Sequence, residues 1–426
     1  MIPIFKALDI IKSQVQILST EEVDLTEVCG RVLAQEIFAD TDLPPFDRSQ
    51  MDGFAVKTED TRTVPVKLKI IGESAAGKGF NGKIKRGEVV RIMTGARLPK
   101  GANAVQKVEL TEENEGCVTI LESVKENQNL IKRAEEIWEG ERIFELGEIV
   151  SENMIAPLAA FGYANVKVFQ KPKVLILATG SEIVDVNQKP KQDQIRNSNS
   201  ITLKVLAEKC GAKVQVLPSV KDDFENLKMQ IAGAVELKFK SQIPNPKVLN
   251  PKSKVPNEQS KILNPKSKIL IISGGVSVGD YDFTKPALRE LGAEVFFEKV
   301  SLRPGKPTVF AKLNDTLIFG LPGNPVSVAV TFHLFVRKAI LQMQGAKTSQ
   351  PQKGFAVLQQ KIKGAKERDS FLPAFVETNE QGKLIIESLR FSGSSNFIAY
   401  SRANALVFVP KGEILETGEV AEIVFL

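Results

Sequence analysis

The sequence predicts a multidomain protein of the α/β plus β class, built around a three-layer α/β domain with a mostly parallel sheet. Three observations predict this class. Apolar, β-branched runs alternate with helical segments over residues 171–345. Short strands and glycine turns fill residues 46–144, and residues 346–426 alternate apolar and polar side chains without long helices. We therefore expect a β-rich inserted domain, a C-terminal β-barrel-like domain, and a helical N-terminal and dimerisation domain made of residues 1–45 and 145–170.

The N-terminal stretch MIPIFKALDIIKSQVQIL predicts a core helix. Ile4, Leu8, Ile11 and Val15 recur at helical spacing. The stretch carries Asp9 and lacks a basic segment followed by a cleavage site, which argues against a signal peptide. No other apolar run is expected to cross a membrane.

The order of elements in the central domain follows from the alternation of apolar runs and helical patterns. Strands are predicted at 173–179, 214–217, 269–273, 295–298, 308–311 and 316–319. Helices are predicted at 200–210, 222–237, up to Leu291, and from Val326 onward. In such a sheet, ligands bind at the carboxyl ends of the strands.

The segment ILIISGGVSVGDYDF, Ile269–Phe283, carries the strongest chemical signal. A buried strand ends at Ser273, and glycines that tolerate positive φ let backbone N–H groups face an anion. Two acids follow, which suits a phosphate that is bound together with Mg²⁺. The candidate residues are Ser273, Gly274, Gly275, Ser277, Asp280 and Asp282.

Two proline-rich turns form a second set of candidates. In LPGNP, two prolines around Gly323 and Asn324 precede a helix whose free N–H groups favour anions; an ordinary β-to-α turn explains this motif equally well. RPGKP supplies cations for phosphate or oxyanion contact. The candidates are Pro322, Gly323, Asn324, Pro325, Arg303 and Lys306, with RNSNS (196–200) as a further cation and cap at a helix start.

Composition excludes several classes of chemistry. His333 is the only histidine, which argues against a Ser-His-Asp triad, a three-histidine zinc site and most histidine relays, and a core imidazole is the expected role. Cys29, Cys117 and Cys210 are odd in number and scattered, which favours a reducing cytoplasm over a disulfide framework.

The net charge of +6 lies in one stretch, which weakens a nucleic-acid interpretation. Residues 239–268 hold seven lysines and one glutamate, so the rest of the chain is formally neutral. LNPKSKV and LNPKSKI repeat there without a period that would bury a face, which predicts a solvated insertion; a polybasic docking loop is the alternative.

GESAAGK, residues 72–78, is a near match to a phosphate-binding P-loop. Gly79 stands where Ser or Thr would bind Mg²⁺, and the following residues do not open a helix. A hairpin turn is therefore expected.

Six motifs together resemble the molybdopterin molybdenumtransferase family, which includes MoeA and the gephyrin E domain. They are PPFDRSQMDGFAV, RIMTGARLPKGANAV, ATGSEI, SGGVSVGDYDF, RPGKP and GLPGNPVS, in the family's order across almost the whole chain. The resemblance implies an elongated homodimer of four-domain subunits. It also implies insertion of molybdate into adenylylated molybdopterin, with Mg²⁺, and release of AMP.

The resemblance assigns roles residue by residue. Asp52 and Thr94 match catalytic positions in the first β domain, and Glu182 and Asp282 match catalytic positions that would hold the metal. Lys299 and Arg303 match basic positions around the PGKP turn and would contact molybdate, while Pro322 and Pro325 match the PGNP prolines. The family arrangement would bring Asp52 and Thr94 of one subunit towards Glu182 and Asp282 of the other.

Three positions depart from the family pattern. Ala134 stands where relatives have glycine, and Glu136 where they have aspartate. Pro373 stands where many relatives have arginine, which argues against a contribution of the C-terminal region to the pocket.

Two other functions remain open from the sequence. One is molybdopterin adenylyltransferase activity, which the extra domains argue against. If this chain is not that enzyme, a separate molybdopterin adenylyltransferase is expected to hand over the substrate. The other is a non-enzymatic, gephyrin-like scaffold. No nucleic-acid or membrane partner is expected, and molybdate and tungstate are equivalent at this level because their size and charge are nearly alike.

Overall fold

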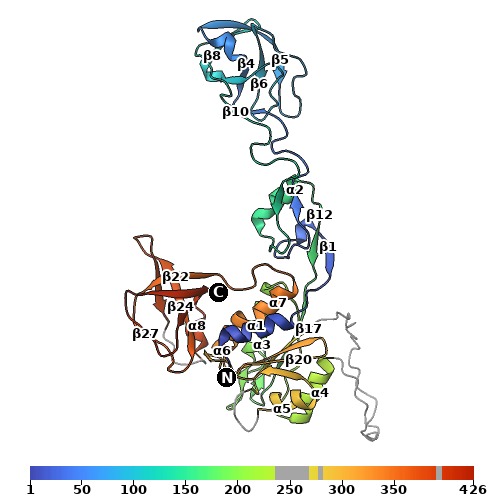
Figure 1. Cartoon of the computed structure of the whole chain (residues 1–426), viewed down its shortest axis with the longest axis vertical. Coiled ribbons are helices and arrows are strands. Elements are labelled where there is room, and N and C mark those ends of the chain that lie inside the picture. The colour runs from blue at the N-terminus through green and yellow to red at the C-terminus, as the bar shows by residue number, and fades with distance from the viewer. Residues whose placement is uncertain (236–267, 277–281, 390–395) are drawn as a thin grey trace. The chain divides into compact units, whose positions relative to one another are not determined.

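The computed structural model describes residues 1–235, 268–276, 282–389 and 396–426, and it separates into two compact units (Figure 1). The large unit comprises residues 1–34, 147–151 and 166–426. The small unit comprises residues 35–146 and 152–165. The Lys-rich stretch 239–268 lies outside the described residues except for Lys268, which is buried at the start of a strand.

The large unit contains a mixed sheet with the order β16-β13-β17-β21-β20-β18. The strands are β16 (Lys213–Val216), β13 (Lys173–Ala178), β17 (Lys268–Ser273), β21 (Thr316–Leu321), β20 (Val309–Leu313) and β18 (Glu294–Phe297). The first four pair in parallel, and the last two are antiparallel to their neighbours.

Side chains along the central strands alternate between two separate buried clusters. Ile269 and Ile271 of β17 belong to one cluster, and Leu270 and Ile272 belong to the other. Because successive side chains of a strand point to opposite faces, both faces of this sheet are buried. This accounts for the continuous apolar runs in the sequence.

Helices supply the other half of each cluster. The first cluster includes residues from α1 (Ile4–Gln14), α3 (Ser198–Lys209), α6 (Pro325–Thr331) and α7 (Arg337–Met343); the second includes residues from α4 (Phe224–Ala234) and α5 (Thr284–Glu290). The predicted N-terminal core helix is confirmed, because Ala7 and Ile11 of α1 are fully buried.

One helical segment is long and apolar enough to cross a membrane, contrary to the sequence expectation. It runs from Pro325 to Met343 through α6, the π-helical turn η5 (Phe332–Val336) and α7, with a mean hydropathy of 1.3 in its most apolar window. That window is 89% buried inside the fold. Its apolar character is therefore that of a core helix.

The predicted strands at 295–298 and 308–311 were expected to continue the parallel sheet, but both are antiparallel to their neighbours. Strands β20 and β21 are joined by the two residues Asn314 and Asp315, and Leu313 pairs with Thr316. A two-residue loop can join only antiparallel strands, and Asn314 supplies the positive φ of 53° that such turns need.

The C-terminal region forms a closed five-stranded barrel, as the sequence predicts. Its strands are β22 (Lys353–Leu358), β24 (Asp369–Thr378), β25 (Leu384–Ser388), β26 (Ala405–Val409) and β28 (Val420–Phe425). Pairing of β24 with β26 closes the ring, and the short strand β19 (Leu302–Arg303) adds to β24. Closing the sheet into a ring removes the unpaired strand edges that an open sheet would expose. Two short strands, β23 (Ile362–Lys363) and β27 (Ile414–Leu415), pair beside it.

The helical N-terminal domain expected from residues 1–45 and 145–170 is mostly not helical. Within these fully described stretches, α1 and α2 (Ile155–Ala160) are the α-helices, and β1 (Thr20–Asp24) pairs with β12 (Asn165–Phe169). The alternating exposure of β1 explains the error, because a half-exposed edge strand lacks the apolar period of a core strand.

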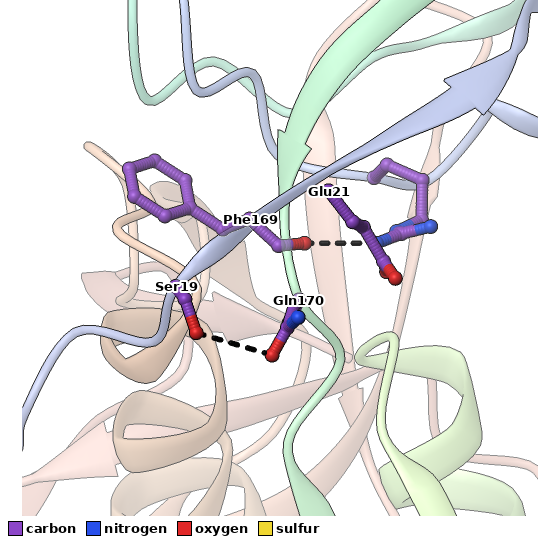
Figure 2. A network of polar contacts seen from close by, with 5 residues as sticks. Ser19, Glu21, Phe169 and Gln170 are labelled. Atoms are coloured by element: carbon purple, nitrogen blue, oxygen red, sulfur yellow. Dashed lines mark hydrogen bonds and ion pairs between the residues drawn. The ribbon is translucent and has the colours of Figure 1, made fainter.

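A polar network fastens β1 to the chain at the end of β12 (Figure 2). The Arg31 guanidinium donates to Glu21 and to the Phe169 carbonyl oxygen, the latter at 2.8 Å, and the Ser19 hydroxyl donates to Gln170 at 3.3 Å. Arg31 is almost fully buried, so these contacts replace the water that its charge has lost.

The small unit is built on a six-stranded sheet with the order β7-β4-β6-β5-β9-β8. The strands are β4 (Gly53–Val56), β5 (Val66–Ser74), β6 (Glu88–Ile92), β7 (Ala104–Lys107), β8 (Thr111–Asn114) and β9 (Cys117–Ile120); short pairs join β2 (Ile37–Phe38) to β11 (Arg142–Phe144) and β3 (Arg48–Ser49) to β10 (Leu130–Ile131). In GESAAGK, Ala75 and Lys78 exchange both backbone hydrogen bonds around Gly77. The predicted hairpin turn is confirmed.

Candidate active site

A large cavity of about 1030 Å³ lies in the large unit where three parallel strands end. It is lined by residues that follow β13, β17 and β21, and by the loop that leads from β14 (Ile183–Val184) and β15 (Ile195–Arg196) into α3. The carboxyl ends of parallel strands lie at one edge of a sheet, so turns that are far apart in the sequence meet here. This is the place where the sequence predicts a ligand.

The SGG turn forms the floor of this cavity. Gly274 and Gly275 have φ values of 100° and 61°. A Cβ atom on Gly274 would lie 2.5 Å from the Thr179 carbonyl oxygen, and one on Gly275 would lie 3.0 Å from the Thr179 hydroxyl. The turn therefore requires glycine for both its dihedral angles and its space. Ser277 and Asp280, predicted in the same loop, lie outside the described residues.

The LPGNP turn lines the same cavity and is tied to the SGG turn. The Asn199 side-chain amide donates to the Ser273 hydroxyl at 3.1 Å and to the Gly323 carbonyl oxygen at 2.6 Å. The Gly274 N–H donates to the Leu321 carbonyl oxygen at 3.2 Å. Asn199 therefore holds together the two turns that the sequence singles out separately. The four predicted residues of this turn that line the cavity are Pro322, Gly323, Asn324 and Pro325.

Three carboxylates face the cavity. Glu182 and Asp282, both predicted, line it together with Asp222. Asp222 accepts the Ser181 N–H at 2.9 Å, while its neighbour Asp223 caps α4 by accepting the Asn226 N–H at 2.7 Å. Within the described residues, no group of three or more His, Cys, Asp or Glu side chains is placed to hold a metal by itself.

A buried hydroxyl at the end of β13 lacks a partner. Thr179 is 6% exposed and lines the cavity, and its Oγ1 atom makes no hydrogen bond within the described part of the chain. A buried polar atom without a partner costs roughly 1–3 kcal/mol. A polar group of a bound ligand would remove this cost.

Asp52 and Thr94, predicted in the first β domain, contact each other in the small unit. The Thr94 N–H and hydroxyl both donate to one Asp52 carboxylate oxygen, each at 2.7 Å. These hydrogen bonds, the backbone one foremost, hold the pKa of the Asp52 carboxyl below its usual value. The carboxylate is thus kept charged and oriented at neutral pH.

Of the predicted cations, Arg196 of RNSNS lines the large cavity, whereas Lys299, Arg303 and Lys306 do not. Lys299 lines a separate hollow of about 470 Å³ with Met1, Ile2 and Arg289. Arg303 is half-buried in β19 and Lys306 is exposed, one residue before the cavity residue Pro307. Their role in binding molybdate stays a prediction.

Comparison with known proteins identifies the family. Three family models match in order along the chain: the MoeA N-terminal region (domain I and II) at residues 2–162, a probable molybdopterin binding domain at 256–342, and the MoeA C-terminal region (domain IV) at 356–426. The molybdopterin molybdenumtransferase of Staphylococcus aureus strain MSSA476 is 34% identical over 415 residues, covering 96% of this chain and 92% of that protein. The chain belongs to the molybdopterin molybdenumtransferase (MoeA) family.

Further relatives agree with this family assignment. The molybdopterin molybdenumtransferase of Haemophilus influenzae is 34% identical over 91% of this chain and 89% of its own length. A crystal structure of the molybdopterin biosynthesis MoeA protein from Pyrococcus horikoshii OT3 matches with a TM-score of 0.79 and 28% identity, covering 100% of both chains. The MoeA fold therefore extends over the whole chain.

Two departures from the family pattern can be placed in the small unit. Ala134, in the position of the family's glycine, has a φ of 58° in the left-handed region, and its N–H donates to the Pro44 carbonyl oxygen. Glu136, in the position of the family's aspartate, faces Arg48 at 3.6 Å. The backbone conformation that glycine favours is thus retained with a side chain in place.

Three of the residues that line the cavity have a place there that the sequence did not indicate. Thr179 looked like the end of a strand, and Asn199 looked like a helix cap, although Asn197 is the actual cap of α3. Phe397, at the start of α8 (Phe397–Tyr400), comes from the C-terminal region of this MoeA-family chain. The expectation that this region does not contribute was therefore wrong. Pro373 lies in β24 opposite Leu406, and the contribution comes from a different segment.

Proposed function

We propose that this chain inserts molybdenum from molybdate into adenylylated molybdopterin and releases AMP in a Mg²⁺-dependent reaction. Molybdenum insertion into molybdopterin is the activity named for its family. The observation that supports the adenylylated substrate is the large cavity, where a glycine turn, the LPGNP turn and three carboxylates meet at the end of one sheet. No other cavity of the described residues joins these features.

The size and shape of the cavity suit a nucleotide-linked substrate. Ligand pockets commonly measure about 300–1,000 Å³, and this one lies at the upper end of that range at about 1030 Å³. The helix that begins at Pro325 runs without interruption to Met343, so its N-terminus favours a phosphate at the LPGNP turn. The positive-φ glycines of the SGG turn allow a phosphate to approach the backbone closely.

The acidic residues of the cavity fit Mg²⁺ that is bound together with phosphates. Mg²⁺ usually takes one or two carboxylates, with substrate phosphates and water completing its shell. Glu182 and Asp282 would hold the ion, as the family resemblance assigns, and both line the cavity. When bound, Mg²⁺ neutralises charge that develops on the departing phosphate.

The protein's own contribution is to hold and orient the substrate. The SGG and LPGNP turns bind the phosphates, and Asn199 fixes the distance between the turns. Thr179 offers its hydroxyl to a polar group of the ligand at the floor of the cavity. Lys299, Arg303 and Lys306 are our candidates for attracting molybdate, which is a dianion.

The test is release of AMP from adenylylated molybdopterin by the purified protein. Release should require both molybdate and Mg²⁺, and Asp282→Ala should reduce it at least about 100-fold. Asp193→Asn, an exposed acid in the loop before α3 that does not line the cavity, is the matched control and should keep full activity. Unchanged release by Asp282→Ala would contradict the assignment of that residue.

We further propose that the active form is a homodimer in which Asp52 and Thr94 complete the cavity of the partner subunit. Asp52→Asn and Asp282→Asn should each be inactive alone. Mixed dimers would carry one site with both carboxylates intact, so an equal mixture that exchanges subunits should recover about a quarter of wild-type activity. A monomeric enzyme, or a mixture that stays inactive after exchange, would contradict this arrangement.

The substrate also implies a source. An adenylylated phosphate is an activated anhydride, so we propose that a molybdopterin adenylyltransferase hands it over directly and that both proteins work in the cytoplasm. Co-purification of the two proteins, and faster AMP release from enzyme-generated than from free substrate, would support the handover.

A further inference from the structure

A second, smaller cavity lies in the large unit, away from the strand ends. Its volume is about 300 Å³. Lys209 and Cys210, at the end of α3, line it on one side, and His333 and Arg337, from the helix Pro325–Met343, line it on another. Nothing in the proposed reaction uses these residues.

The polar lining of this cavity is basic. Among the described residues that line it, three carry basic groups and none is an aspartate or glutamate. Lys209 is exposed, Arg337 is half-buried, and His333 is 8% exposed. Arg337 donates one N–H to the Ser349 carbonyl oxygen at 3.0 Å, which orients its guanidinium and is the one hydrogen bond assigned to it among the described residues. A half-buried guanidinium in a lining that holds no Asp or Glu side chain favours an anion.

The charges of Arg337 and Lys209 both affect the pKa values of His333 and Cys210, so the four groups lie close together. Burial, together with the charges of Arg337 and Lys209, lowers the pKa of His333 to about 4. Burial raises the pKa of the Cys210 thiol against the opposing effect of the same two cations, and the net value is about 11. At pH 7 the imidazole and the thiol are therefore neutral, so neither compensates the charge of Arg337 and Lys209.

The helix end that faces this cavity does not exclude an anion. Carbonyl groups at the C-terminus of α3 would repel negative charge. The Cys210 carbonyl oxygen, however, accepts a hydrogen bond from the Gln344 side chain at 2.9 Å. This contact satisfies the carbonyl group of the residue that caps α3, which lessens the repulsion.

We propose that this cavity is a binding site for a small tetrahedral oxyanion of the sulfate and phosphate class, held by Arg337 and Lys209, with His333 as a further N–H donor that gains charge in acid. The guanidinium supplies paired N–H donors, the ammonium supplies charge at the mouth, and the imidazole supplies an N–H from the buried side. The proposal is independent of the proposed function, because no residue of the large cavity takes part.

Because His333 is the only histidine of the chain, its imidazole reports on this cavity alone. In protein labelled with ¹³C at the histidine Cε1 position, sulfate should shift the single imidazole signal in a saturable way. Bound sulfate should raise the pKa of His333, so sulfate should bind more tightly at pH 5 than at pH 8. Sulfate stays a dianion over this range, so the pH dependence belongs to the protein.

Two variants test the assignment of the cations. Arg337→Met should weaken sulfate binding by about tenfold or more, and Lys209→Met, at an exposed position, should weaken it a few-fold. Lys204→Met, on the same helix and paired with Glu208, is the matched control and should bind like the wild type. Asp282→Asn should leave the sulfate-induced shift intact while it removes AMP release.

Comparison of anions tests the class of ligand. Similar shifts with sulfate, phosphate and molybdate would support a site for tetrahedral oxyanions. An unchanged His333 signal with all three at tens of millimolar would overturn the proposal. A shift with AMP but none with inorganic phosphate would overturn it as well, and so would equal binding by wild type and both cation variants.

Discussion

The two cavities of the large unit have linings of opposite charge although they share two helices. The large cavity has Glu182, Asp222 and Asp282 in its wall against one cation, Arg196, whereas the small cavity has Lys209, His333 and Arg337. Helix α3 begins after Asn197 at the large cavity and ends with Lys209 at the small one. The helix Pro325–Met343 likewise begins at the large cavity, and its later residues His333 and Arg337 line the small one. Its N-terminus adds partial positive charge only at the large cavity.

The difference indicates two ways of binding an anionic ligand. In the large cavity, carboxylates would repel a bare phosphate, so binding depends on backbone N–H groups, helix N-termini and a cation brought with the ligand. In the small cavity the protein supplies the positive charge itself. The first arrangement suits a reaction in which charge changes, and the second suits simple occupancy by an ion.

Removal of both metal-binding candidates should give the largest effect. Glu182→Gln with Asp282→Asn keeps the size of both side chains, and AMP release should fall at least about 100-fold. The sulfate-induced shift of His333 should stay as in the wild type. Loss of both responses would show that the two cavities are coupled, and retained activity would show that these acids do not serve the reaction.

Removal of the Asn199 side chain should give a smaller loss of activity in the large cavity. Asn199→Ala removes the donor to Ser273 and Gly323, so kcat/KM should fall about tenfold and unfolding free energy should fall by roughly 1–3 kcal/mol. Steady-state kinetics and urea titration measure the two quantities. Asn187→Ala, in an exposed loop, is the control and should change neither.

Reversal of one charge in the small cavity should affect occupancy and leave activity unchanged. Lys209→Glu removes a cation that lowers the pKa of His333 and adds an anion, so this pKa should rise from about 4. Sulfate affinity should fall about tenfold. A titration of the imidazole signal measures both. Reduced AMP release in this variant would show that the small cavity serves the reaction after all.

A change in the small unit should provide the smallest effect and a baseline for both cavities. Ala134→Gly relieves a left-handed backbone conformation, so the small unit should be stabilised by roughly 0.5–1 kcal/mol. Thermal unfolding checks this gain, while AMP release and the sulfate response should stay unchanged. Destabilisation would mean that packing of the buried methyl group outweighs the backbone strain.

Much of the central domain follows from local sequence because its strands are continuous apolar runs. The predicted 269–273 strand differs from β17 by one residue, and the SGG and LPGNP turns lie at one cavity, as strand-end geometry requires. Strand direction was missed at Val309–Leu313, because an apolar run carries no direction. The Asn314–Asp315 turn held the missing signal.

Other contacts have no local signature. The contact of Asp52 with Thr94 joins two segments of the small unit, and only the family's motifs suggested that both residues belong to one site. Thr179 lies in the ATGSEI motif but only as the residue after a strand, and Phe397 occupies no motif at all. Their position in the cavity depends on the packing of whole elements, which neither periodicity nor spacing encodes.

The order of synthesis imposes a delay on the N-terminal helix. Ile2 bridges to Val300, and Ala7 and Ile11 of α1 share a cluster with Phe335, Leu406 and Val424. The small unit draws all of its residues from positions 35–165, so it can fold as soon as this stretch leaves the ribosome. The first helix must wait for residues that emerge much later. A nascent chain stalled soon after residue 165 has left the ribosome should therefore present a protected small unit and an α1 that is still open to proteases.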